Sequence, residues 1–131
     1  MTFTLADSGV AVTGGVDTHL DTNMAAALDG VGGQLGTKEF PTTTSGYRAL
    51  HTWLESFGTV VRVGVEGSGG YGAGLARYLG AQGVPVIEVV RPNRQNRRRR
   101  GKTDPIDALS AARAALSGEA SGLAKTRNGA V

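Results

Sequence analysis

Two aspartates three positions apart follow directly on a tract of arginines near the end of the chain. Asp104 and Asp107 lie in GKTDPIDALSAARAAL, which continues from RPNRQNRRRR. Two further acids stand in apolar surroundings, Asp17 in GGVDTH and Glu66 in VVRVGVE. An unpaired charge buried in an apolar strand is costly, so Asp17 needs a partner or a chemical role.

Four carboxylates brought within a few ångströms of one another repel, and some must take up protons unless cations neutralise them. Two divalent ions cancel four negative charges, and ligand sets made only of oxygen favour Mg²⁺ or Mn²⁺. A pair of such ions about 3.5 to 4 Å apart stabilises the attacking and leaving oxygens of a phosphoryl transfer. The quartet therefore predicts a metal site with catalytic and ligating roles for Asp17, Glu66, Asp104 and Asp107.

The aspartates near the arginines also have a purely structural interpretation. In TDPIDA, Asp104 is placed to cap a helix, Pro105 to open it, and Asp107 to face the positive end of the helix dipole. The two interpretations are compatible, because residues three apart on a first turn project from one face.

The first strand leaves two questions open. Asp17 has an alternative partner in Arg62 on a neighbouring strand. His19 and Asp21 share its parity, so DTHLD offers either three ligands on one strand face or a plain polar hairpin end.

The net charge of +3 conceals a strong asymmetry. Residues 91–102 hold seven basic groups and no acid, which leaves seven basic against eleven acidic residues elsewhere. Each Lys or Arg that contacts a backbone phosphate releases a condensed counterion, so this tract predicts nucleic-acid binding, with a solvated basic loop as the alternative. The predicted contacts are Arg91, Arg94, Arg97, Arg98, Arg99, Arg100 and Lys102.

The elements that must position these residues can be read from hydrophobic periodicity and from turn residues. The chain opens as an antiparallel meander of three strands and continues as a helix and then as β-α-β-α. The expected strands are 10–19, 23–29, 33–40, 60–66 and 84–90, and the expected helices are 44–57, capped by Thr44 or Ser45, then 71–83 and 104–116.

This order of elements is that of the ribonuclease H-like (RuvC-like) α/β fold, with a mixed central sheet. Its β-α-β part implies parallel pairing through right-handed crossovers. If the first and fourth strands are neighbours, Asp17 and Glu66 meet at their carboxyl ends, and the last helix adds Asp104 and Asp107.

A dinucleotide fingerprint is the rival interpretation of EGSGGYG. Gly67, Gly69 and Gly72 match G-x-G-x-x-G after a strand, and Glu88 follows about twenty residues later. Against this, Glu66 places a carboxylate beside the pyrophosphate, and a meander precedes the strand that should begin such a fold.

Four stretches of the chain are distinctive in combination: GVDTH, FPTTTSGYRAL, VGVEGSGGYGAGLARYL and VVRPNRQNRRRRGKTDPIDALSAARAAL. Through them nearly the whole chain, about residues 9–131, resembles the amino-terminal RuvC-like DEDD domain of the bridge-RNA-guided insertion-sequence transposases. The resemblance implies that Asp17, Glu66, Asp104 and Asp107 bind Mg²⁺ or Mn²⁺ for DNA strand cleavage and exchange. The implied partners are DNA of the mobile element and its target, a structured noncoding guide RNA and further copies of the protein.

The expected organisation is an N-terminal extension at 1–8, the catalytic domain at 9–118 and a polar tail at 119–131. Cysteine is absent, and no export leader or membrane span is recognisable, so a cytoplasmic location is expected. Family members carry a serine nucleophile in a second domain, and no serine here matches its motif. A fragment inactive by itself is therefore expected, with a nucleic-acid-binding module without autonomous catalysis as the alternative.

Overall fold

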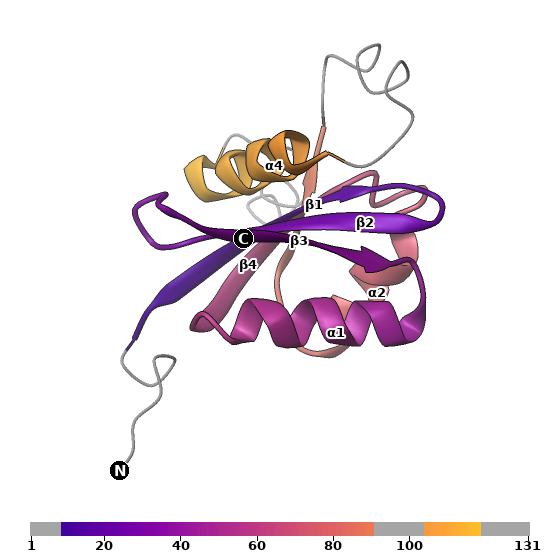
Figure 1. Cartoon of the computed structure of the whole chain (residues 1–131), viewed down its shortest axis with the longest axis horizontal. Coiled ribbons are helices and arrows are strands. Elements are labelled where there is room, and N and C mark those ends of the chain that lie inside the picture. The colour runs from indigo at the N-terminus through magenta and orange to yellow at the C-terminus, as the bar shows by residue number, and fades with distance from the viewer. Residues whose placement is uncertain (1–8, 91–103, 119–131) are drawn as a thin grey trace, which may run out of the picture.

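The computed structural model describes residues 9–90 and 104–118, which form one mixed sheet with helices on both faces. In Figure 1, α4 lies on one side of the sheet, and α1 and α2 lie on the other. The strands are β1 Ala11–Thr18, β2 Thr22–Leu28, β3 Gln34–Pro41, β4 Thr59–Glu66 and β5 Val86–Val89. The helices are α1 Thr44–Glu55, α2 Ala73–Ala81 and α4 Pro105–Ser117.

The sheet has the strand order β3-β2-β1-β4-β5. β1 pairs with β2 and β2 pairs with β3 in antiparallel fashion, so the predicted meander is confirmed. β4 pairs in parallel with both β1 and β5. This is the mixed α/β sheet expected of a ribonuclease H-like fold, and it makes β1 and β4 central neighbours.

Large apolar side chains fill the space between the sheet and the pair α1 and α2. Leu50 and Leu54 from α1 are fully buried, as are Leu75 and Leu79 from α2. Trp53 of α1 is partly buried and packs against this cluster. The inner face of α1 is therefore part of the core.

The N-cap of α1 and the start of α2 differ from the sequence prediction. Thr43 is the N-cap of α1, where its Oγ1 accepts the Gly46 N–H at 3.0 Å; the prediction of Thr44 or Ser45 is wrong. α2 begins at Ala73, not at Tyr71, because the glycine-rich segment first makes a turn, in which Gly67 adopts a φ of +79°. A positive φ is accessible to glycine at little cost.

The opposite face of the sheet is packed with small residues. A Cβ at Gly15 would overlap the Ala112 amide nitrogen and the Ala108 carbonyl oxygen of α4. A Cβ at Gly64 on β4 would lie 2.8 Å from the Ala111 carbonyl oxygen. Backbone therefore meets backbone here, and α4 lies closer to β1 and β4 than ordinary side chains would allow.

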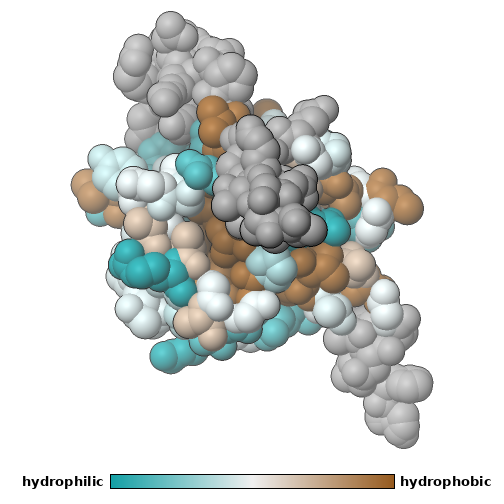
Figure 2. Space-filling view, turned by 180° about the vertical axis from the view of Figure 1, so that it is seen from behind, coloured by the Kyte–Doolittle hydropathy of each residue, from teal (hydrophilic) through white to brown (hydrophobic). Residues whose placement is uncertain are grey.

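Five large apolar side chains are exposed within the described residues, and four of them lie at one edge of the sheet. Leu20 follows β1 and Val90 follows β5. Tyr71 precedes α2, and Ile106 lies on the first turn of α4. Figure 2 shows the molecule from behind, where apolar residues gather in the middle of the face. The edge where β1, β4 and β5 end thus combines apolar rim residues with the acidic groups described below.

None of the helices in the described part of the chain is long and apolar enough to cross a membrane.

Candidate active site

Asp17 and Glu66 lie side by side at the carboxyl ends of β1 and β4. They are register partners in the parallel pair, and they are only 0% and 4% exposed. The Thr18 hydroxyl donates a hydrogen bond of 2.7 Å to the Glu66 carbonyl oxygen and so ties the ends of the two strands together. The sequence predicts the meeting of the two acids but gives no signal for this role of Thr18.

The first turn of α4 lies against Asp17. Asp104 is the N-cap, and its Oδ1 accepts the Ile106 N–H at 2.8 Å. The Asp104 N–H in turn donates to Asp17 Oδ2 at 3.1 Å. Asp107 is 6% exposed and close enough for its charge to act on Asp17. Asp104 therefore caps α4 and also contacts Asp17, and Asp107 lies near Asp17 as well, as the spacing of the two aspartates allows.

Burial raises the pKa of Asp17 above its ordinary value of 3.8. The neighbouring Glu66 carboxyl, the nearby His19 and the Asp104 amide oppose this effect, whereas the Asp107 charge adds to it. Carboxylates buried next to one another repel unless a proton or a cation reduces their charge. The site therefore needs either a proton or a cation to be stable.

The donor set fits a hard divalent cation in part. With both carboxyls ionised, Oδ1 of Asp17 is buried and has no hydrogen-bond donor within the described residues. Among residues 9–90 and 104–118, however, no three acidic or histidine side chains converge closely enough to enclose an ion. Mg²⁺ usually keeps several waters and takes substrate phosphates as ligands, so it needs only one or two carboxylates from the protein.

The alternative partner of Asp17 is excluded. Arg62 lies opposite Thr13 in the register of β1 and β4, and its Nη1 donates to Thr13 Oγ1 at 2.6 Å. That contact is four residues along β1 from Asp17, so the guanidinium does not neutralise this acid.

The DTHLD stretch is a hairpin end, because β1 stops at Thr18 and the His19 N–H bonds to the Thr22 carbonyl oxygen. His19 Nδ1 is 3.9 Å from Asp17 Oδ2 and remains near the acids. Asp21 is exposed, and its carbonyl oxygen accepts the Thr42 N–H at 2.9 Å. Asp21 is therefore placed in the hairpin rather than among the acids of the candidate site.

The glycines after Glu66 form the turn into α2, but the surrounding sheet is not that of a dinucleotide-binding fold. The strand before the turn is the fourth in chain order, and antiparallel strands precede it. Glu88 lies in β5 and is exposed. The fingerprint is therefore a local match with a structural explanation.

The predicted phosphate contacts Arg91, Arg94, Arg97, Arg98, Arg99, Arg100 and Lys102 lie outside the described residues, as do the extension 1–8 and the tail 119–131. The described ends of this segment, Val90 after β5 and Asp104 before α4, both lie at the acidic edge. The assignment of these basic residues to nucleic acid stays a prediction.

Comparison with known proteins gives one positive finding. A family model, DEDD_Tnp_IS110, described as a transposase, matches residues 14–128. That range includes all four acids of the candidate site. No match is found among the curated proteins.

Proposed function

The chain belongs to the DEDD_Tnp_IS110 transposase family, and from this premise we propose that its four acids bind divalent metal during DNA strand cleavage and exchange. DNA is the substrate of a transposase. The proposal rests most directly on one observation: Asp17 and Glu66 are register partners on central strands, and the first turn of α4 bonds to Asp17.

The residues of the chain divide the work of such a site. Asp17 and Glu66 hold the cation from rigid strand ends, and Thr18 keeps those ends together. The Asp104 N–H fixes Asp17 Oδ2, which leaves Oδ1 available to a ligand, while Asp107 adds negative charge from α4. When bound, Mg²⁺ or Mn²⁺ stabilises the attacking and leaving oxygens of phosphoryl transfer.

The partners of the domain follow from the resemblance and from charge. We assign nucleic-acid backbone contacts to the basic residues of 91–102, because that segment joins the end of β5 to the start of α4, and both lie at the acidic edge. A structured guide RNA and further copies of the protein are the other proposed partners. The covalent step of strand exchange is assigned to a separate serine-bearing domain, so this domain alone is expected to bind metal and DNA without exchanging strands.

A nucleic-acid-binding module without its own metal site is the second candidate. It is favoured by one observation, the absence of three convergent ligands within the described residues. The two candidates differ in how binding responds to metal, because carboxylates that hold no cation repel a DNA phosphate.

The test measures the affinity of the chain and of its Asp17→Asn variant for duplex DNA, at one ionic strength, in Mg²⁺ and in chelator. The proposal predicts tighter binding in Mg²⁺ for the wild type and a much smaller response for the variant. A response that is equal in both proteins, together with a steep dependence on salt, favours the simple binding module.

A further inference from the structure

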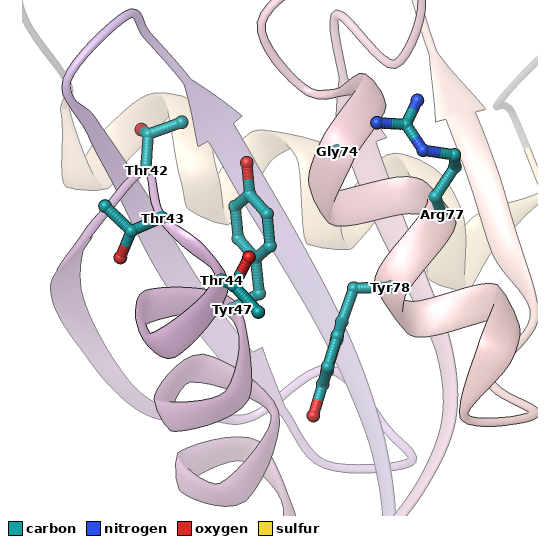
Figure 3. Close-up of a pocket in the computed structure, with 7 residues that line it drawn as sticks. All are labelled: Thr42, Thr43, Thr44, Tyr47, Gly74, Arg77 and Tyr78. Carbon is teal, nitrogen blue, oxygen red and sulfur yellow. The ribbon is translucent and has the colours of Figure 1, made fainter.

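A cavity of about 510 Å³ lies between the start of α1 and the face of α2. Its volume is within the range of small-molecule sites, roughly 300 to 1,000 Å³. Its lining is polar and aromatic: Thr42, Thr43, Thr44, Tyr47, Gly74, Arg77 and Tyr78 (Figure 3). None of these side chains belongs to the acidic site described above.

The cavity is joined to the acidic edge through the first hairpin. The Thr42 hydroxyl donates to the His19 carbonyl oxygen at 3.2 Å, and the Thr42 N–H donates to the Asp21 carbonyl oxygen. The turn of this hairpin follows Thr18, which is the residue after Asp17 on β1. The cavity and the acids therefore share one edge of the sheet but lie on opposite faces, the cavity with α1 and α2 and the acids with α4.

Arg77 gives the cavity an available positive charge. Its side chain is exposed, and within the described residues no carboxylate lies within salt-bridge distance of it. Figure 3 shows the Arg77 guanidinium and the Tyr47 hydroxyl toward the same end of the cavity, whereas the Tyr78 hydroxyl points the other way. A guanidinium with neighbouring hydroxyl donors is a characteristic partner of phosphate.

Close packing holds Tyr47 in place at this site. A Cβ at Gly74 would lie 2.6 Å from the Tyr47 hydroxyl oxygen, so only glycine lets the phenol ring approach α2 this closely. The Tyr47 ring also packs against Tyr78, with ring centroids 6.3 Å apart. The phenol group thus stands in a defined position between the two helices.

We propose that this cavity binds a phosphodiester group, with its attached nucleoside, of the nucleic-acid strand that runs past the acids. The proposal rests on the function proposed above. Four carboxylates repel a polyanion, and Arg77, at the same edge but on the other face, attracts the neighbouring part of the strand. The Tyr47 and Thr44 hydroxyls donate to the phosphate, and the tyrosine rings offer contact to the sugar or base.

The experiment uses the full 131-residue chain and measures its affinity for single-stranded DNA and for RNA of the same sequence over a range of salt concentrations. Arg77→Gln removes the cavity cation. Arg113→Gln is the matched control, because it removes the same charge from an exposed position on α4, across the sheet. Midpoints of thermal unfolding establish that both variants are folded.

We expect Arg77→Gln to weaken binding about tenfold. The slope of log affinity against log salt concentration should become shallower by about 0.7, which corresponds to one phosphate contact on a single strand. Arg113→Gln should stay within about twofold of the wild type. Tyr47→Phe, which keeps the ring, should weaken binding about threefold through loss of one hydrogen bond. A loss confined to DNA or to RNA also supports the site and identifies which strand occupies it.

Equal effects of Arg77→Gln and Arg113→Gln on both nucleic acids would overturn the proposal. All measurements are repeated in chelator with Asp17→Asn as the background. If the Arg77 effect persists there, the cavity acts independently of metal. If metal does not change nucleic-acid affinity, the result counts against the proposed function. If Arg77→Gln does not change it, the result counts against the cavity as a binding site.

Discussion

The two faces of the central sheet are packed in opposite ways. Under α1 and α2, the sheet is covered by large side chains, among them the fully buried Leu50, Leu54 and Leu75. Under α4, the contacts are between glycine, alanine and backbone, with Gly15 directly beneath Ala112. One face therefore contributes most of the buried apolar volume, and the other brings a helix unusually close to the strands.

The close approach has a consequence for the acids. α4 reaches β1 with its backbone, so the Asp104 N–H can bond to the Asp17 carboxylate. A layer of leucines between α4 and the sheet would hold the first turn of the helix several ångströms further away. The α1 and α2 face therefore supplies most of the stability of the domain, whereas the α4 face positions the acids. Variants on the two faces should separate these two roles.

Leu54→Ala should show the largest loss of stability. Leu54 is fully buried on the α1 face, and removing such a side chain leaves a cavity that costs about 2 to 5 kcal/mol. Unfolding in denaturant measures the loss. The increase in stability that Mn²⁺ gives should be as large as in the wild type, because the acids lie on the other face of the sheet. Loss of the Mn²⁺ effect in Leu54→Ala would contradict the separation.

Gly15→Ala and Gly14→Ala form a matched pair of neighbours on opposite faces. A Cβ at Gly15 meets the α4 backbone, which cannot yield without moving the helix, so we expect a cost of about 2 to 3 kcal/mol and a lost metal response. A Cβ at Gly14 meets only side-chain atoms, the nearest being Leu54 Cδ1 at 3.0 Å, with Val63 Cγ2 at 3.4 Å, and these can shift, so we expect about 1 kcal/mol or less. Equal losses in unfolding free energy would contradict the account.

Much of this arrangement could be predicted from sequence, because it depends on local patterns. Runs of β-forming residues separated by turn residues predict the meander, and the alternation of strands and helices predicts the parallel pairing of β4. The meeting of Asp17 and Glu66 followed, since parallel neighbours end at the same edge. The cap at Asp104 was recognisable from the proline after it.

The features that escaped prediction depend on tertiary distance. Thr43 was missed as a cap by one residue, because three threonines in a row compete for that role. The sequence places the GG pair of β1 in a strand but gives no sign that Gly15 decides how near α4 comes. Arg62 was a reasonable partner for Asp17 until the register placed it opposite Thr13. The cavity at Arg77 joins two helices that no sequence pattern relates.

Thr18→Val should give the smallest change in stability, about 1 kcal/mol, because it removes one buried hydrogen bond while keeping the shape of the side chain. Thr18→Ser, which retains the hydroxyl, is the control. The sharper effect is on the site: without the bond to the Glu66 carbonyl oxygen, the end of β4 is held less firmly, and Mn²⁺ should bind more weakly. Calorimetric titration with Mn²⁺ checks this, and unchanged affinity would remove Thr18 from the account.

The pKa of Asp17 determines what its replacement does in the absence of metal. Burial raises this pKa, so the folded state favours the protonated acid. Stability from this group is therefore present at low pH and is lost as pH rises through the raised value. At pH values above this raised pKa, the wild type buries a charged carboxylate at position 17, whereas asparagine is neutral. In chelator, Asp17→Asn should therefore unfold at the same temperature as the wild type or a higher one.

The most direct test of the central claim, that these carboxylates form a metal centre, is thermal unfolding of the wild type and Asp17→Asn titrated with Mn²⁺ without nucleic acid. An ion that binds only the folded state adds about 2.7 kcal/mol at a hundred times its dissociation constant. We predict that the wild-type midpoint rises and overtakes that of Asp17→Asn, which stays constant. Equal shifts, or no shift in either protein, would contradict a metal centre built by this domain.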